Sequence, residues 1–378
     1  MASSLAFIDL KKQYNEIKDD LAQRLHKVID SCAFIQGPYV AELEEALANY
    51  VGVPHAITCA NGTDALTLPL LALELKPLDA VFCPTFTFIA TAEVISLRGA
   101  APVFVDVDPV TFNMCPKDLE QKIVLLRESG QYIPKGIICV DLFGLPADYP
   151  AIEAIAKKYN LFILEDAAQG FGSRIGEKIA GSFGQVAGTS FFPAKPLGCY
   201  GDGGAVFTSD GELAKVLRSL KSHGQGKDKY EHQRVGMNSR LDTLQAGVLL
   251  AKLKVFPQEL QLRQKAASLY NERLADIVEV PSIPPGYLSA YAQYTVKLKR
   301  GQRDRVQAQL KDQGIPTMVY YPKPLHKQPA YAYGAARVGE CPIAENLSEV
   351  VLSLPMHPYL EESDIDRVTD ALKAAIKG

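Results

Sequence analysis

The sequence contains no tryptophan, and its histidines and cysteines are few and scattered. The six histidines do not cluster, which argues against a histidine-metal centre. The cysteines are odd in number and include no Cys-x-x-Cys pair, which argues against a disulfide framework and against a zinc site. We interpret all seven as reduced and mostly buried: Cys32, Cys59, Cys83, Cys115, Cys139, Cys199 and Cys341.

An excess of one charge is also missing. The 40 Lys and Arg residues nearly balance 43 Asp and Glu residues, for a net charge of −3. Such a chain has no basic field for nucleic acid and no polybasic anchor for a membrane. No segment is apolar for long enough to span a bilayer, and residues 1–10 lack the basic region of a secretion signal. We therefore expect a cytoplasmic protein without a nucleic-acid or membrane partner.

From about residue 55, short apolar runs typical of strands alternate with longer amphipathic helical patterns. This alternation predicts an α/β fold with a mostly parallel sheet covered by helices on both faces. The 378 residues suffice for one large core and a smaller one. Strands are predicted at residues 56–59, 80–83, 103–106, 136–140 and 161–164.

A small C-terminal α+β domain is predicted beyond a long helix at 241–274, which Pro257 would kink. The predicted division is residues 1–250 for the large domain and 251–378 for the small one. Two N-terminal helices would pack on the small domain or on a partner subunit. The remaining predicted elements are helices at 14–31, 40–50, 303–313 and 363–377, strands at 291–298 and 317–320, and a Pro-rich loop at 280–286.

One lysine, Lys195, stands between an apolar strand and the glycine-rich turn Gly201-Asp202-Gly203-Gly204. A partly desolvated lysine loses some of its preference for the charged form, and the neutral amine can attack a carbonyl or a pyridoxal aldehyde. The glycines would let the backbone approach a bound group. The same pattern also fits a solvated lysine before an ordinary turn.

Other polar residues follow predicted strands, at the edge where open α/β sheets bind ligands. Asp166 could pair with the protonated ring nitrogen of pyridoxal phosphate (PLP), or it could cap the next turn. Gln169 could bind the phenolic oxygen of that cofactor, or lie in solvent.

The segment Asn61-Gly62-Thr63 precedes an amphipathic helix, so its amides could bind a phosphate at the helix start. An ordinary helix cap explains the segment equally well. Ser190 could add a hydroxyl donor to the same phosphate. Phe88 could stack on a planar ring or belong to the core.

Seven motifs, in order along the chain, resemble those of the DegT/DnrJ/StrS family of PLP-dependent sugar aminotransferases. The resemblance implies the aspartate-aminotransferase architecture, fold type I, and a homodimer with shared active sites. It covers the chain from residue 7 to the end. The motifs lie at residues 34–38, 61–66, 87–91, 165–169, 190–204, 236–242 and 321–326.

By this resemblance Lys195 forms the Schiff base with the cofactor and acts as the general base. Asp166 would pair with the ring nitrogen and Gln169 with the phenolate oxygen. Phe88 would stack on the ring. The phosphate contacts implied are Gly62, Thr63, Ser190 and, from the neighbouring subunit, Asn238.

The substrate residues implied are Arg240, Tyr321 and His326. Arg240 is a candidate clamp for a carboxylate of glutamate or of an acidic sugar, or else a surface charge at a helix start. Tyr321 and His326 fall where the family builds its sugar pocket.

The residues around Lys195 resemble the branch that aminates C3 of a keto sugar nucleotide. Segments 234–246 and 353–360 resemble aminotransferases for UDP-2-acetamido-2-deoxy-3-oxo-glucuronate, which make precursors of surface polysaccharide. L-Glutamate would donate the amino group and leave as 2-oxoglutarate. The alternatives are a dTDP-3-keto-6-deoxyhexose or a 4-keto sugar as substrate, a PLP-dependent sugar dehydratase, and a non-catalytic regulator of the same fold.

Overall fold

A computed structural model describes residues 5–228, 230–336 and 338–377. The central sheet consists of β1 (His55–Cys59), β2 (Asp79–Pro84), β3 (Ala101–Val105), β4 (Ile133–Val140), β5 (Phe162–Asp166), β8 (Val186–Ser190) and β9 (Gly204–Thr208). Its order is β1-β9-β8-β5-β4-β2-β3, and only β9 runs antiparallel to its neighbours. The predicted mostly parallel α/β sheet is confirmed.

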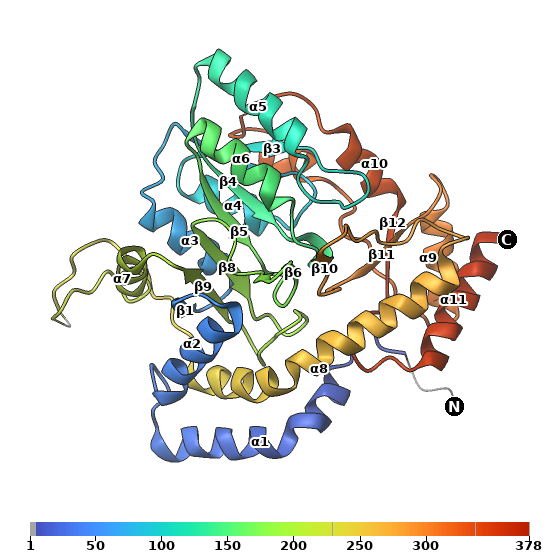
Figure 1. Ribbon diagram of the computed structural model, residues 1–378, viewed down its shortest axis with the longest axis horizontal. Coiled ribbons are helices and arrows are strands. Elements are labelled where there is room, and N and C mark those ends of the chain that lie inside the picture. Colours follow the sequence, from blue (N-terminus) through green and yellow to red (C-terminus); the bar gives the residue numbers. More distant parts are fainter. Residues whose placement is uncertain (1–4, 229, 337, 378) are drawn as a thin grey trace.

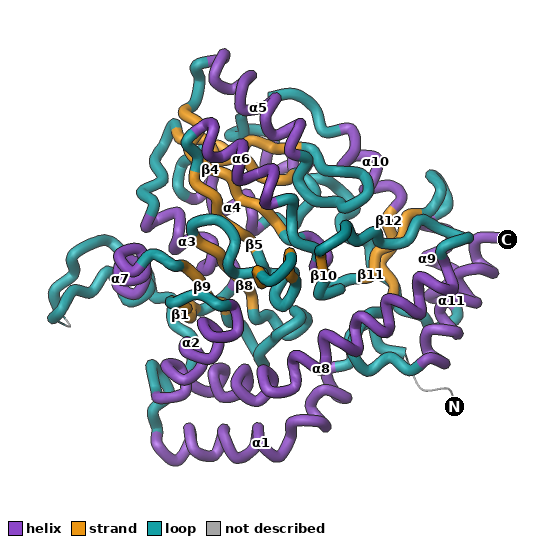
Figure 2. The backbone as a smooth tube through the Cα atoms, viewed as in Figure 1, coloured by secondary structure: helices purple, strands orange, loops and turns teal. Residues whose placement is uncertain are grey.

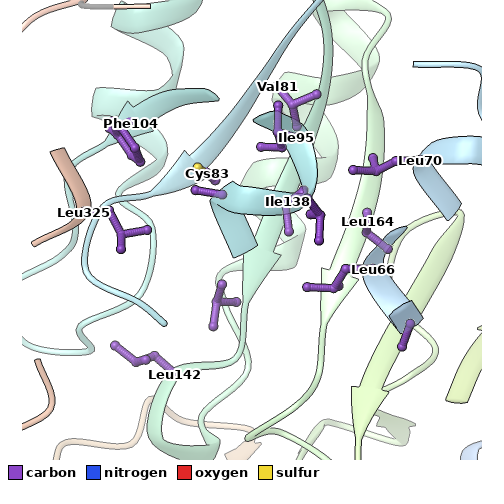
Figure 3. Close-up of a cluster of buried hydrophobic side chains, with 14 of the residues drawn as sticks. Leu66, Leu70, Val81, Cys83, Ile95, Phe104, Ile138, Leu142, Leu164 and Leu325 are labelled. Atoms are coloured by element: carbon purple, nitrogen blue, oxygen red, sulfur yellow. The ribbon is translucent and has the colours of Figure 1, made fainter. Parts of the chain in front are cut away.

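Helices cover both faces of this sheet (Figures 1 and 2). Successive strand residues point to opposite faces, so a strand buried on both sides is apolar throughout. On β2, Val81 and Cys83 join a core with α3 (Gly62–Ala72), α4 (Ala90–Leu97) and α7 (Gly211–Leu220), part of which Figure 3 shows. Ala80 and Phe82 join the opposite core with α5 (Pro116–Ser129) and α6 (Tyr149–Tyr159).

Two N-terminal helices, α1 (Leu10–Ser31) and α2 (Pro38–Val51), pack on α8 (Thr243–Leu274). Apolar residues of all three helices share a core with Ala56 of β1. Helix α8 continues through Pro257, and Figure 1 shows it bending as it leads into the C-terminal elements. Because α8 is one helix across residue 250, the division of the chain at that point stays a prediction.

The C-terminal elements form a small core around a two-stranded sheet of β11 (Tyr294–Lys297) and β12 (Val351–Leu354). Helices α9 (Arg303–Asp312) and α11 (Glu362–Lys377) pack in this core with the end of α8. Leu325 instead lies in the main core (Figure 3). The other elements are β6 (Arg174–Ile175), β7 (Lys178–Ile179), β10 (Tyr287–Leu288), α10 (Pro342–Val350) and the 3-10 helices η1 (Leu142–Gly144), η2 (Leu325–Lys327) and η3 (Pro329–Tyr331).

The strand predicted at residues 317–320 is wrong. Met318 pairs with Ser353 of β12 at a single position, through backbone hydrogen bonds of 3.1 and 2.8 Å. Pro316 and Pro322 flank this segment and have no N–H groups with which to extend a ladder. In the ranges that the structure describes, we find no helix long and apolar enough to cross a bilayer.

Candidate active site

The residues predicted to bind the cofactor gather at the carboxyl edge of the parallel strands. Asp166 is the last residue of β5, and Ser190 is the last residue of β8. Lys195 lies in the turn after β8, and Gly62 begins α3 just after β1. Open α/β sheets bind ligands at this edge, where several strand ends meet.

The start of α3 and the end of β8 form a candidate anion site. The side chain of Asn61 accepts a hydrogen bond of 2.8 Å from the amide of Asp64, which leaves the first amides, Gly62 and Thr63, without partners inside the helix. A Cβ built on Gly62 would lie 2.5 Å from the Cβ of Ser190. Glycine therefore brings the helix start and the serine together, as a phosphate site requires.

Asp166 is a buried carboxylate with a defined orientation. It accepts hydrogen bonds from Thr91 Oγ1 at 2.9 Å and from the amide of Ala168 at 3.2 Å. Burial raises the pKa of Asp166, while these two donors and the nearby Lys195 lower it. A cation placed against this carboxylate would complete its charge balance. Sequence analysis included Thr91 in the motif at residues 87–91 but gave it no role.

Lys195 is partly exposed, and its amide donates to the carbonyl of Phe192 at 2.9 Å. Burial of the ammonium group lowers the pKa of Lys195, and the charge of Asp166 opposes this effect. A lowered pKa increases the fraction of neutral amine, the form that attacks an aldehyde.

Gln169 has both ends of its amide engaged. Its Oε1 accepts from the amide of Phe143 at 2.8 Å, and its Nε2 donates to the hydroxyl of Tyr321 at 3.1 Å. Burial raises the pKa of Tyr321, and its ring packs edge-on against Phe86. The structure thus joins two predicted residues that sequence analysis had assigned to separate roles.

The segment with Asn238 and Arg240 docks at the start of α3. Between these two residues, Ser239 donates to Asp64 at 2.7 Å and accepts from the amide of Ala60 at 3.2 Å. The side chain of Asn238 is exposed. Arg240 is half-buried, and within the described residues its guanidinium has no hydrogen bond or ion pair.

Two other predicted site residues, Phe88 and His326, have surroundings that do not test their predicted roles. Phe88 is 57% exposed, so within this chain it contributes little to the core. His326 has both ring nitrogens occupied, with Thr85 Oγ1 at 2.7 Å and Glu345 Oε1 at 3.0 Å. The stacking role of Phe88 and the sugar-pocket role of His326 stay predictions.

These groups fit PLP. The buried Asp166 carboxylate suits a pyridinium nitrogen, the start of α3 with Ser190 suits a phosphate, and Lys195 suits the aldehyde. For metal chemistry, no group of three or more His, Cys, Asp or Glu side chains within residues 5–228, 230–336 and 338–377 is arranged to hold an ion.

Comparison with known proteins gives full-length matches. UDP-2-acetamido-2-deoxy-3-oxo-D-glucuronate aminotransferase of Pseudomonas aeruginosa is 48% identical over 369 residues, covering 97% of this chain and 99% of that protein. UDP-N-acetyl-3-dehydro-alpha-D-glucosamine 3-aminotransferase of Acidithiobacillus ferrooxidans is 41% identical over 377 residues, covering 100% and 99%. A solved DegT DnrJ EryC1 StrS aminotransferase from Brucella abortus has a TM-score of 0.96 at 50% identity, covering 98% of this chain and 99% of that one.

The pattern of one protein family matches nearly the whole chain, over residues 15–373. This match agrees with the geometry of the site, in which an amine, a buried carboxylate and a helix start meet at one edge of the sheet. The chain belongs to the DegT/DnrJ/EryC1/StrS aminotransferase family, and it is a PLP-dependent sugar aminotransferase.

Proposed function

We propose that this enzyme transfers the amino group of L-glutamate to C3 of UDP-2-acetamido-2-deoxy-3-oxo-glucuronate. The observation that carries the choice of an acidic sugar concerns Arg240, a half-buried residue next to Ser239 at the start of α3. Within the described residues, its guanidinium has no hydrogen bond or ion pair. An arginine in this state is suited to bidentate binding of a carboxylate. The relative from Pseudomonas aeruginosa, 48% identical, supports the same substrate.

PLP, when bound, withdraws electrons from the carbon that carries the amino group. The buried Asp166 carboxylate keeps the ring nitrogen protonated, and Thr91 and Ala168 hold that carboxylate in place. Gln169 donates a hydrogen bond to the phenolic oxygen. The start of α3 and Ser190 hold the phosphate.

Lys195 moves the protons. Its Nζ, favoured in the neutral form by burial, takes the proton from Cα of glutamate in the first half-reaction. In the second half-reaction Nζ delivers a proton to C3 of the sugar. The two substrates therefore use one site in turn, and 2-oxoglutarate leaves before the sugar binds.

We also propose a homodimer with shared active sites. Several large apolar side chains are exposed in a single chain, and exposed apolar surface of this kind is typical of an interface. These residues are Phe34 at 42%, Ile35 at 49%, Phe88 at 57%, Phe192 at 53% and Val235 at 92% exposure. The exposed Asn238 would reach the phosphate of the neighbouring subunit.

Seven free cysteines support a reducing compartment, for which we propose the cytoplasm.

The second candidate is a neutral keto sugar, favoured by the 41% identity to the glucosamine enzyme from Acidithiobacillus ferrooxidans. A coupled assay of glutamate-dependent amination separates the two, with the 3-keto uronate and the neutral 3-keto sugar as competing UDP-linked substrates. A dTDP-3-keto-6-deoxyhexose serves as a third substrate. We expect preference for the uronate. Preference for a neutral sugar would overturn the substrate assignment.

The variant Arg240→Ala tests the clamp. Loss of a bidentate, charge-assisted pair costs about 3 kcal/mol, so kcat/KM for the uronate should fall about a hundredfold. The value for the neutral sugar should change little, and Arg240→Lys should restore only part of the loss. The half-reaction with glutamate alone is the control, since an equal loss there would assign Arg240 to the amino donor instead.

A further inference from the structure

The turn at residues 141–147, which includes η1, is fastened by one buried side chain from a distant segment. Asn113 precedes α5 and is 3% exposed. Its Nδ2 donates to the carbonyls of Leu145 and Pro146 at 2.9 and 3.1 Å. Its Oδ1 accepts from the amide of Leu142 at 3.0 Å. Both ends of the Asn113 amide are therefore used to hold this turn.

The C-terminal part of the chain closes the turn from its other side. The carbonyl of Gly144 accepts a hydrogen bond of 2.8 Å from the amide of Ala290. A Cβ built on Gly144, whose φ is +98°, would lie 2.7 Å from the amide nitrogen of Tyr291. The backbones approach so closely that the turn has little freedom to move.

Within this turn the backbone of Phe143 is held in the left-handed region, at a φ of 58°. That conformation is uncommon for a residue with a side chain, so its surroundings must enforce it. The Phe143 amide donates to Gln169 Oε1 at 2.8 Å. The ring of Phe143 packs edge-on against Phe112, the neighbour of Asn113, at 5.4 Å between centroids.

The Phe143 amide decides which way the Gln169 amide faces. An N–H group can pair only with the oxygen of a glutamine amide, so Oε1 must point to Phe143 and Nε2 must point away from it. One hydrogen of Nε2 goes to Tyr321, at 3.1 Å, and the second remains for another acceptor. With the amide reversed, Gln169 would offer lone pairs to a phenolate and repel it.

We propose that Asn113 is a positioning residue for the cofactor: through the turn at 141–147 it keeps the Gln169 amide facing its donor toward the phenolic oxygen of PLP. This inference rests on the proposed role of Gln169. When PLP is bound, a hydrogen-bond donor at its phenolic oxygen would stabilise the negative charge on that oxygen, most strongly in the deprotonated form of the chromophore. The donor therefore lowers the pKa of the cofactor chromophore.

The test is a pH titration of the visible absorbance of the holoenzyme, for wild type, Asn113→Ala, Gln169→Met and the double variant. Loss of one hydrogen bond to a charged group should raise the chromophore pKa by about one unit in Gln169→Met. Asn113→Ala should raise it by at least about half as much. If Asn113 acts through Gln169, the double variant should shift no further than Gln169→Met alone.

Gln185→Ala is the matched control, because Gln185 also uses its amide oxygen to bind a backbone N–H, that of Ile163 in β5. It should leave the chromophore pKa unchanged. Asn113→Ser removes fewer of the hydrogen bonds between residue 113 and the turn, and it is titrated instead if Asn113→Ala does not fold. An unshifted pKa in the folded Asn113 variant overturns the inference, and so does an additive shift in the double variant. A wild-type protein without a chromophore would instead contradict the assignment of Lys195.

Discussion

Asp141, which directly follows β4, and Glu165 of the neighbouring strand β5 form a buried pair of carboxyl groups that predicts a specific pattern of stability. Glu165 accepts from the amides of Gly181 and Phe183, at 2.6 and 2.8 Å, with one oxygen each. Oδ1 of Asp141 accepts two hydrogen bonds, while Oδ2 has no N–H or hydroxyl donor among the residues that the structure describes. Burial raises the pKa of Asp141 and of Glu165, so the pair holds a proton. We place that proton on Asp141 Oδ2, donated to Glu165, because both oxygens of Glu165 already accept from backbone amides and this arrangement satisfies every oxygen.

This assignment makes two similar substitutions unequal. Asp141→Asn replaces the Oδ2 hydroxyl by an amide N–H, so the hydrogen bond to Glu165 survives. Glu165→Gln turns an NH2 group against the amide of Gly181 or Phe183. It loses one hydrogen bond to a charged acceptor and leaves a buried N–H unsatisfied, which together cost about 3 to 5 kcal/mol. Asp141→Asn should stay within about 1 kcal/mol of wild type near pH 4, where Asp141 holds its proton in the folded protein.

The pair also predicts how stability depends on pH. Burial raises the pKa of Asp141 from 3.8 to about 7. A carboxyl pKa that is higher in the folded state stabilises the fold below the ordinary value, and this stability is lost as pH rises through the raised value. This contribution to stability is therefore lost between about pH 4 and pH 7. Asp141→Asn lacks the titrating proton, so it should melt above wild type at about pH 8.

Thermal unfolding of the cofactor-free proteins, followed by circular dichroism at several pH values, measures these differences. All proteins must be at one concentration, since association shifts the melting temperature. Equal pH slopes for wild type and Asp141→Asn would refute the shared proton. Tolerance of Glu165→Gln together with loss of folding in Asp141→Asn would place the proton on Glu165 instead.

Further predictions concern the anion site and the carboxylate. Gly62→Ala would force a Cβ to within 2.5 Å of the Cβ of Ser190, so the PLP dissociation constant of the apoenzyme should rise about tenfold or more. Gly211→Ala, at the start of α7, is the matched control, because its Cβ would meet nothing nearer than 3.5 Å; equal PLP affinity in the two variants would contradict the anion site. Thr91→Val removes a 2.9 Å hydrogen bond to Asp166 and should lower kcat about tenfold, while Thr91→Ser should restore it. An unchanged kcat in Thr91→Val would show that Asp166 needs no support from that hydroxyl.

The sheet and the positions of Lys195 and Asp166 could be predicted because they follow from local pattern. Apolar runs alternating with helical segments specify parallel strands, and polar residues just after such runs fall at the binding edge. The strand β9 was not predicted, because the glycines before it are typical of a turn. The prediction of a strand at 317–320 was wrong because strand pairing depends on the edge of a partner strand and on backbone N–H groups, which the flanking prolines lack.

The contacts that orient the site could not be predicted. Gln169 and Tyr321 lie 152 residues apart, and Gln169 reaches Phe143 only because the turn at 141–147 holds an uncommon backbone conformation. No spacing in the sequence signals that Asn113 holds this turn. Which of the described side chains lie near the guanidinium of Arg240 likewise depends on the fold.

The measurement that most directly tests the account is a comparison of wild type and Lys195→Ala with L-glutamate and the UDP-linked 3-keto uronate. Wild type should lose its visible absorbance on addition of glutamate, regain it with the keto sugar, and release 2-oxoglutarate and the amino sugar in equal amounts. Lys195→Ala should fold and show no turnover, a loss of at least about a thousandfold. Turnover retained by Lys195→Ala, or a wild-type absorbance that glutamate leaves unchanged, would contradict the central claim.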